Sequence, residues 1–554
     1  MYSDMARTDT SAGDRFLLLV VFLVGVGTLG IEMVMPRLLA PFFGTSQPIW
    51  AVVIGMTLAY LAIGYRVGGS LADRWPDARL LYRMIAWSGL LCAIIPLVAR
   101  PLLSLAQYSL RHIVAGGFIG SLVVVLLLFA APVILMATVG PFAVRLQLRR
   151  FEEGVAAAGR TAGTISAVST LGSILGTFLT VLVLIPAIGT AATIFLFSAF
   201  LVALGIVGLR DWRYLLMLLA VAALAVAHYA FDATIKTADC VSCTLVAEAE
   251  SDYNYIQVAK QQIVYDDGTP DPRHVLVLNE GQATHSVYRL KYRQTGDPLD
   301  LLTDGGPWDY FSVAPYVYAN RDPQSVNSLA LLGSAAGSVP KQFLAIYGPQ
   351  TKIDAVEIDQ KIVDLGRQYF DLEDQNPRFP NYHTHVQDAR SWLASAEGRY
   401  DVIGMDAYHQ PYIPFHLTTV EFFQQVKDHL TPQGVAVVNA GRPASGDDRL
   451  VNALASTMLA VFPQVYVIDT RFSNAILIGV HEPAGDGVQN FKANAGRMQI
   501  QSLQLVMYWS LNEGRFGPVR EFSADQARYA PFTDDCAPVE QLVDGLILNE
   551  VTRP

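Results

Sequence analysis

Three features that could do chemistry each follow a short apolar run of the sequence. The turn Gly333-Ser334-Ala335-Ala336-Gly337 would let a ligand approach the backbone, Glu357 follows Gly333 by 24 positions, and Asp406 ends a third apolar run. A carboxylate at that distance, at the end of the next strand, can accept hydrogen bonds from two ribose hydroxyls. The spacing predicts a nucleoside site, and the alternative is a structural turn followed by a surface acid.

Histidines and cysteines give weaker signals. His383 and His385 could hold a metal, but no third ligand stands at a telling spacing, so we expect solvated strand residues and no metal. Cys240 and Cys243 could form a redox pair or pair with Cys536. In a reducing compartment we expect these thiols to be unlinked.

The elements that would position this chemistry alternate between strand and helix. Short apolar strands next to helical patterns predict a parallel, doubly wound sheet. Ligands of such sheets bind beyond the carboxyl ends of the strands, where Glu357 and Asp406 would lie. A small β-region is expected before it, from Tyr255–Lys260 and His274–Leu278. The predicted strands are Ser328–Leu332, Ile353–Glu357, Asp401–Met405 and Val435–Asn439, and the predicted helices are Val339–Ile346, Gln360–Phe370 and Thr419–Leu430.

The charge distribution divides the 554 residues into two unlike halves. Residues 1–231 hold 15 Arg, no Lys and 9 acidic residues, a balance of +6, whereas residues 232–554 have a balance of −16. An acidic soluble half argues against nucleic acid as a partner, because phosphate binding needs Lys and Arg.

The first half has apolar stretches long enough to cross a bilayer, which takes about 20 residues. We expect a membrane domain at 1–235, a β-rich region at 240–320 and a nucleoside-binding domain at 321–554. The membrane domain should have seven spans. Pro101–Val114 is an eighth candidate, but a surface helix is the preferred interpretation. The seven expected spans are Phe16–Ile31, the part of Leu38–Tyr65 from Ile49 onward, Met84–Ala99, Ile119–Val144, two within Thr161–Leu209 and Tyr214–Phe231.

Small residues and one acid stand out in these spans. Gly64 and Gly68 in the second span, and Gly172 and Gly176 in the fifth, predict close helix packing, and such faces could also join two copies of the chain. Glu32 is a candidate site or proton carrier, or an internal partner for Arg37 or Arg66.

Seven spaced motifs make residues 250–440 resemble the polyamine aminopropyltransferases, the spermidine synthase family. The region Glu32 to Gly44 also resembles membrane-fused members of that family. The motifs are Glu250–Ile256, Val275–Gln282, Leu331–Gly337, Ala355–Asp359, Gln387–Arg390, Tyr400–Asp406 and Leu417–Gly434.

The resemblance implies a fold like that of S-adenosylmethionine-dependent methyltransferases, with S-adenosylmethionine or its decarboxylated form as substrate. Glu357 would hold the ribose hydroxyls and Asp388 the adenine amino group. The implied substrate-binding residues are Gly333, Gly337, Glu357, Asp388, Gln282, Tyr253 and Asn254, and the implied catalytic residues are Asp406, His409 and Tyr310.

The departures from the family pattern fall on the amine half of that site. Ala336 and His409 stand where the family has acids, and the segment Tyr310-Phe311-Ser312 lacks the family's histidine. Polyamines are cations that carboxylates bind, so a polyamine acceptor is disfavoured. His409 could act as a general base near pH 7 or could be an ordinary loop residue.

We therefore predict a membrane-bound enzyme that releases methylthioadenosine, with the substrate carboxylate attacking its own Cγ to give a homoserine-lactone-type product. Ordinary aminopropyl transfer to a polyamine, methyl transfer, and a nucleoside-binding transporter or sensor with an inactive domain are the alternatives. The expected partners are a small molecule and the lipid bilayer.

Two arguments about sidedness conflict. With seven spans, eleven arginines fall on the N-terminal side and three on the other, which puts residues 232–554 outside a bacterial inner membrane. S-adenosylmethionine is made in the cytoplasm, and one missed crossing would reverse the assignment. We expect the catalytic domain in the cytoplasm, with the missed crossing at Pro101–Val114 or near Pro132 or Pro141.

Overall fold

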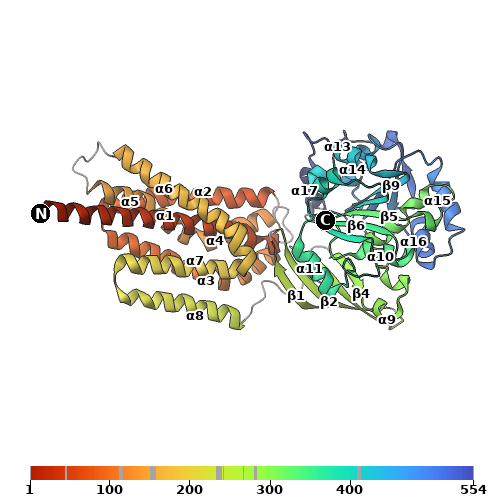
Figure 1. Ribbon diagram of the computed structural model, residues 1–554. Coiled ribbons are helices and arrows are strands. Elements are labelled where there is room, and N and C mark those ends of the chain that lie inside the picture. The colour runs from red at the N-terminus through yellow and green to blue at the C-terminus, as the bar shows by residue number, and fades with distance from the viewer. Residues whose placement is uncertain are drawn as a thin grey trace. The chain divides into compact units, whose positions relative to one another are not determined.

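The chain folds into two compact units in a computed structural model (Figure 1). The helical unit comprises Met1–Thr237 and Glu250–Tyr255, and the α/β unit comprises Ala238–Ala249 and Ile256–Pro554. The structure describes residues 2–43, 47–110, 116–149, 158–231, 240, 242–251, 253–265, 267–279, 284–408, 413–443 and 445–552.

The helical unit is built from long apolar helices. Among its described residues, six helical stretches are long and apolar enough to cross a membrane, which is consistent with a multi-pass membrane protein. Pro101 lies inside α3, so Pro101–Val114 is not a separate surface helix as far as Leu110, and 111–114 lie outside the described residues. The helices are α1 (Tyr2–Phe43), α2 (Gln47–Arg74), α3 (Ala78–Leu110), α4 (Gly116–Ala137), α5 (Val139–Leu148), α6 (Ala158–Leu179), a π-turn (Thr180–Leu184), α7 (Ile185–Leu209), a short 3₁₀ turn (Trp212–Tyr214) and α8 (Leu215–Phe231).

Small residues let these helices approach closely, as predicted. A Cβ atom at Gly172 or Gly176 would collide with the α1 backbone at Phe22 or Val26. Gly64 and Gly68 of α2 likewise contact α4 and Thr138. These four glycines therefore pack within one chain, and a role for such faces in joining two copies stays a prediction.

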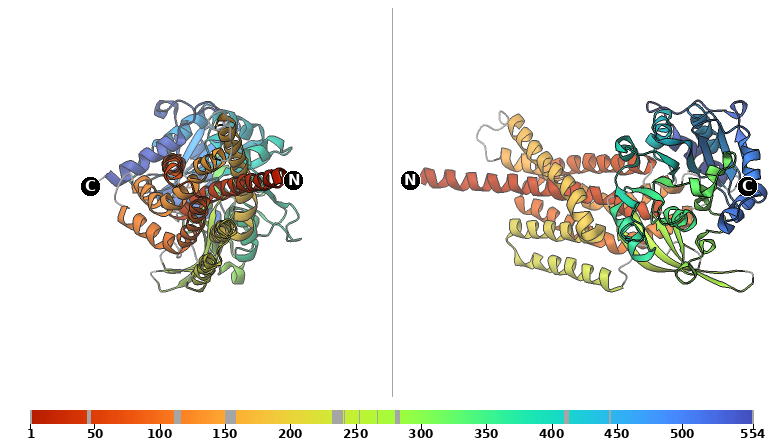
Figure 2. Two further views of the ribbon diagram at one scale, coloured as in Figure 1. Left: turned by 90° about the vertical axis from the view of Figure 1, so that its left-hand side faces the viewer. Right: turned by 45° about the vertical axis from the view of Figure 1, so that its right-hand side comes forward.

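The same contacts give the directions of the helices. Residues 22 and 26 of α1 meet 172 and 176 of α6 in increasing order, so these two helices run parallel. Gly89 of α3 meets Ser198 of α7, whereas Gly205 of α7 meets Tyr82 of α3, so α3 and α7 run antiparallel. Between α6 and the body of α7, Gly189 (φ 79°, ψ 170°) breaks the helix and turns the chain back. Figures 1 and 2 show α7 and α8 as neighbouring yellow helices of opposite direction.

Glu32 is buried in α1, and its Oε1 atom has no hydrogen-bond partner in the part of the chain that the structure describes. Of its two predicted partners, Arg37 donates instead to the Ser251 carbonyl oxygen at 2.6 Å. No ion pair to Glu32 is present among the described residues, so the alternative of a functional acid stays open.

The α/β unit has an eight-stranded sheet in the order β12-β10-β11-β9-β8-β5-β6-β7. The strands β9, β8, β5, β6 and β7 are parallel, and β10, β11 and β12 add an antiparallel edge. Alternate residues of β5 enter two different apolar clusters, Leu329 and Leu331 in one, Ala330 and Leu332 in the other, so both faces of the sheet are covered. The strands are β5 (Ser328–Leu332), β6 (Lys352–Glu357), β7 (Tyr382–Val386), β8 (Tyr400–Met405), β9 (Leu430–Ala440), β10 (Val465–Asp469), β11 (Ala475–Val480) and β12 (Arg520–Phe522).

Helices flank this sheet, and a separate four-stranded sheet precedes it as predicted. The helices are α9 (Tyr292–Thr295), α10 (Ser338–Tyr347), α11 (Gln360–Tyr369), α12 (Ala389–Ser395), α13 (Val420–Asp428), α14 (Arg449–Leu459), α15 (Gly487–Ala495), α16 (Gln501–Asn512) and α17 (Val539–Thr552), and the smaller sheet holds β1 (Cys243–Glu250), β2 (Tyr255–Val264), β3 (Pro270–Leu278) and β4 (Thr284–Arg289).

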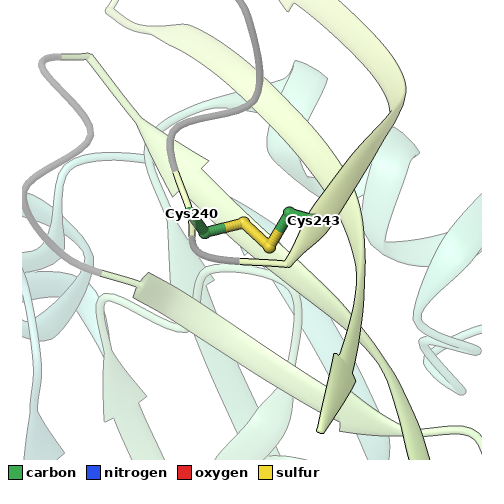
Figure 3. Close-up of a disulfide and its surroundings, with 2 residues drawn as sticks. All are labelled: Cys240 and Cys243. Carbon is green, nitrogen blue, oxygen red and sulfur yellow. A yellow bond between two sulfur atoms is a disulfide. The ribbon is translucent and has the colours of Figure 1, made fainter.

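Cys240 and Cys243 form a disulfide at the start of β1 (Figure 3), so the expectation of unlinked thiols is wrong for this pair. Their Cα atoms lie 5.5 Å apart, a separation that suits a disulfide. Cys536 is free and exposed, and Cys92 is free and buried.

Candidate active site

The glycine turn lies at the carboxyl end of β5, where it leads into α10. Gly333 and Gly337 have φ angles of +87° and +88°, which side chains other than glycine rarely adopt. A Cβ atom at Gly333 would lie 2.6 Å from the Ala407 Cα atom. The turn therefore passes directly against the residues that follow Asp406, and two of the predicted features lie together.

Glu357 is bound to the same turn. Its Oε2 atom accepts the Ala335 N–H at 2.8 Å, and its Oε1 atom accepts the Asp359 N–H at 3.1 Å. Burial raises the pKa of the Glu357 carboxyl to about 7, although both N–H groups favour its charged form. The third predicted feature thus joins the first two at one edge of the sheet.

Asp388 caps the N-terminus of α12. Its Oδ1 atom accepts the Ser391 N–H at 2.9 Å, and its Oδ2 atom lies 3.2 Å from the His416 Nε2 atom. Burial opposes ionisation of this carboxyl, but the Ser391 N–H and His416 outweigh it and hold the Asp388 pKa below its usual value. Asp388 is therefore an ionised acceptor at neutral pH.

Two donors hold Asp406 in place. The Trp308 indole N–H donates to Oδ2 at 2.8 Å, and the Asn439 amide donates to Oδ1 at 2.8 Å. Burial raises the Asp406 pKa to about 6, against the effect of both hydrogen bonds. Because a carboxylate has about four acceptor positions, Asp406 keeps capacity for a ligand.

A second set of contacts fixes Asn439, the last but one residue of β9. Its Oδ1 atom accepts the Asn474 amide at 2.9 Å, and its carbonyl oxygen accepts the Tyr408 hydroxyl at 2.9 Å. The Tyr408 oxygen in turn accepts the Gly441 N–H at 2.7 Å. The Asp406 carboxylate is thus held by a chain of polar contacts rather than by one neighbour.

Sequence reasoning missed Trp308, Asn439 and His416. Asn439 ends the predicted strand Val435–Asn439, so the rule that ligands bind at carboxyl strand ends could have found it. Trp308 and His416 lie in short 3₁₀ helices, Pro307–Ser312 and Phe415–Leu417, that no local pattern marks.

The remaining predicted residues have other surroundings or lie outside the described residues. Tyr310 is fully buried, and its hydroxyl oxygen accepts the Arg471 N–H at 3.2 Å. Tyr253 and Asn254 belong to the helical unit, where both backbone N–H groups donate to the Ser251 hydroxyl. Gln282 and His409 lie outside the described residues.

The turn also holds one buried polar group that a bound substrate could partner. The Ser334 hydroxyl is buried and has no hydrogen-bond partner among the described atoms, which is costly unless a ligand supplies one. Ala336, at the position where the family has an acid, is buried and donates its N–H to the Ser286 hydroxyl at 3.0 Å. The described residues hold no group of three His, Cys, Asp or Glu placed to bind a metal, and His385 instead lies 2.7 Å from the Asp354 carboxylate.

This topology and the glycine turn define the α/β unit as a fold like that of the S-adenosylmethionine-dependent methyltransferases. Residues 264–480 match the spermine/spermidine synthase domain, so the C-terminal half contains a spermidine synthase domain. The chain is 31% identical over 321 residues to a probable polyamine aminopropyl transferase of Bifidobacterium longum. The aligned region covers 55% of this chain and 65% of that relative. The chain is 32% identical over 141 residues to a polyamine aminopropyltransferase of Vibrio vulnificus, covering 25% and 44%.

The chain thus spans less than two thirds of the length of these curated relatives. Among solved structures, a probable spermidine synthase of Corynebacterium glutamicum aligns with a TM-score of 0.38 at 23% identity, covering 51% of this chain and 92% of that one.

Proposed function

We propose that the α/β unit binds S-adenosylmethionine, or its decarboxylated form, and breaks its Cγ–S bond to release methylthioadenosine. The observation that carries this proposal is the convergence of the glycine turn, Glu357 and Asp406 at one sheet edge. Glu357 would bind the ribose hydroxyls and Asp388 the adenine amino group. The Ser334 hydroxyl would gain a partner in the bound nucleoside.

The electrons of the broken bond would go to sulfur, so methylthioadenosine leaves neutral and needs no acid. The enzyme would therefore act mainly by positioning a nucleophile in line with the Cγ–S bond. Trp308 and Asn439 hold Asp406 in place. Its carboxylate would therefore provide a fixed negative charge beside the sulfonium and the methionine-derived chain attached to it. The Tyr310 hydroxyl already binds the Arg471 N–H, so we assign Tyr310 only a role in shaping the pocket.

When S-adenosylmethionine is the substrate, the nucleophile would be its own carboxylate, a group that the decarboxylated form lacks. Its oxygen forms a bond to Cγ as the Cγ–S bond breaks, and the products are homoserine lactone and methylthioadenosine. No proton has to be removed, in contrast to attack by an amine. Ala336 supports this reaction, because the site lacks the acid that would bind an amine there. The reaction also needs no general base, so it requires no catalytic role for His409.

Aminopropyl transfer to a polyamine is the second candidate, and the relatives' names favour it. One further acid, Asp309, is close in sequence to Trp308, but its carboxylate accepts hydrogen bonds from Thr303, Gly305 and Gln342. Asp309 is therefore already satisfied inside the protein, which supports the lactone reaction over binding of a diamine.

The deciding experiment incubates the purified full chain with each substrate, with and without putrescine, and measures methylthioadenosine, homoserine lactone and spermidine. Asp406→Asn should lower methylthioadenosine release at least tenfold, and the exposed Asp535→Asn should not. Adenosylhomocysteine as product would assign methyl transfer. Nucleoside binding without any product would leave a transporter or sensor.

We also propose that the α/β unit lies outside the cytoplasmic membrane, in contrast to the expectation from the sequence. That expectation needed a missed crossing, but α3, α4 and α5 continue through Pro101, Pro132 and Pro141. Because the chain turns back at Gly189, the described helices cross the bundle seven times. The end of α8 therefore lies at the opposite end of the bundle from the start of α1. The arginine distribution and the Cys240–Cys243 disulfide both favour an outer location for the residues after α8.

A further inference from the structure

A cavity of about 400 Å³ lies within the helical unit. Its walls come from residues near the ends of α1, α3 and α8, from the first residues of α7 after Gly189, and from Glu250. All of these helix termini lie at one end of the bundle, so the cavity is at the level where a membrane helix leaves the hydrocarbon. The candidate active site in the α/β unit does not include any of these residues.

One side of the cavity is apolar. Phe42 of α1, Leu103 of α3 and Ile194 of α7 line it and are themselves buried in the helix core. Leu38 and Leu97 extend this surface. A wall of this kind binds a hydrocarbon chain by removing its surface from water.

The other side carries charged groups that the structure holds in place. The Glu250 carboxylate accepts the Thr190 N–H at 2.7 Å, a donor that the helix break at Gly189 leaves without a partner inside the helix. Arg37 donates to the carbonyl oxygen of the next residue, Ser251, at 2.6 Å. These two contacts tie the last residue of β1 and the residue after it to the rim of the cavity.

The charges that line the cavity are unequal in number. Arg37 and Arg100 are cationic, Glu250 is the one acid among the described lining residues, and His228 packs against the Phe195 and Tyr229 rings. Cations in a largely apolar site bind an anion more tightly than they would in water. The shape and charge together describe a ligand that is anionic at one end and apolar along the rest.

We propose that this cavity binds an amphiphile with one hydrocarbon chain and one anionic head group, a carboxylate or a phosphate monoester. The head group would meet Arg37 and Arg100, and the chain would lie along Phe42, Leu97 and Ile194. The volume falls within the range of about 300–1,000 Å³ for small-molecule sites. Such a ligand could be an anionic membrane lipid or a soluble alkyl acid, which share this chemistry.

The test uses the full chain in phosphatidylcholine nanodiscs and measures binding of radiolabelled dodecanoate, with empty discs subtracted. We expect one saturable site that dodecyl phosphate competes for and dodecyltrimethylammonium does not. Arg100→Gln should weaken binding at least tenfold, and Arg74→Gln, at the last residue of α2, should leave it unchanged. Ala227→Phe, which narrows the cavity from α8, should also remove the site.

Equal competition by the cationic and anionic detergents would overturn the proposal, as would unchanged binding in both Arg100→Gln and Ala227→Phe variants that elute as the parent protein does. Discs containing a lysophosphatidate, a membrane lipid with one acyl chain and a phosphate monoester, separate the two sources. Loss of dodecanoate binding in those discs would assign a membrane lipid as the ligand, and retained binding would assign a soluble acid.

Discussion

The Glu357 carboxylate accepts the backbone N–H of Ala335, so the acid at the end of β6 and the turn at the end of β5 form one structural unit. A ligand that donates hydrogen bonds to Glu357 must therefore contact the turn as well. Changes to either residue should alter the same binding step.

Replacing Glu357 should weaken nucleoside binding. Loss of charged hydrogen bonds costs roughly 1.5–3 kcal/mol, so we expect affinity for methylthioadenosine to fall roughly 10- to 150-fold in Glu357→Gln. Calorimetry measures this, and the exposed Glu397→Gln is the matched control. Unchanged affinity in a Glu357→Gln protein with unchanged Tm would place the nucleoside elsewhere.

The same affinity should depend on pH. In the proposed complex the ionised Glu357 carboxylate would accept both ribose hydroxyls. Because burial raises its pKa to about 7, this binding form should be lost as pH falls through that value. From pH 8 to pH 6 we expect about a tenfold loss of affinity in the parent protein. In Glu357→Gln the profile should be flatter over this range, and equally steep profiles would contradict the assignment.

Trp308 should lower the pKa of Asp406, the acid that it contacts. Its N–H favours the charged form of Asp406, so Trp308→Phe should raise the Asp406 pKa above its present value of about 6. The acid limb of methylthioadenosine release should then move to higher pH, whereas Trp75→Phe should not move it. A lower rate with the limb in its original place would indicate a packing role only.

Putrescine should raise methylthioadenosine release only marginally. Ala336 and the satisfied carboxylate of Asp309 leave few acids to bind a diamine. Chromatography of the products with and without putrescine measures this. A large putrescine-dependent rate with spermidine as product would end the lactone proposal and establish aminopropyl transfer.

The exposed thiol of Cys536 reports on sidedness without any added cysteine. If the α/β unit lies outside, a membrane-impermeant maleimide should label spheroplasts that express the protein, and Cys536→Ser should lose the label. Labelling that appears only after lysis would put the unit in the cytoplasm.

Much of the fold could be predicted because the buried strands are apolar runs. The predicted bounds of the first of them, Ser328–Leu332, agree with β5. The edge strand β7 was not predicted as a strand of this sheet, because its Tyr-His-Thr-His-Val sequence is polar. Trp308 reaches Asp406 across 98 residues, and a contact of that range leaves no local pattern in either segment.

The location of Glu250 and the residues after it limits which fragments of the protein are suitable for enzyme assays. The segment that resembles the first family motif, Glu250–Tyr255, is folded with the helices, although the strands on either side of it belong to the α/β unit. A protein truncated at residue 240 to make a soluble enzyme would keep this segment but lose Thr190 and Arg37, the groups that hold it. Activity measured on such a fragment would therefore report on an unanchored motif, and a nanodisc preparation of the whole chain is the proper starting material for enzymology.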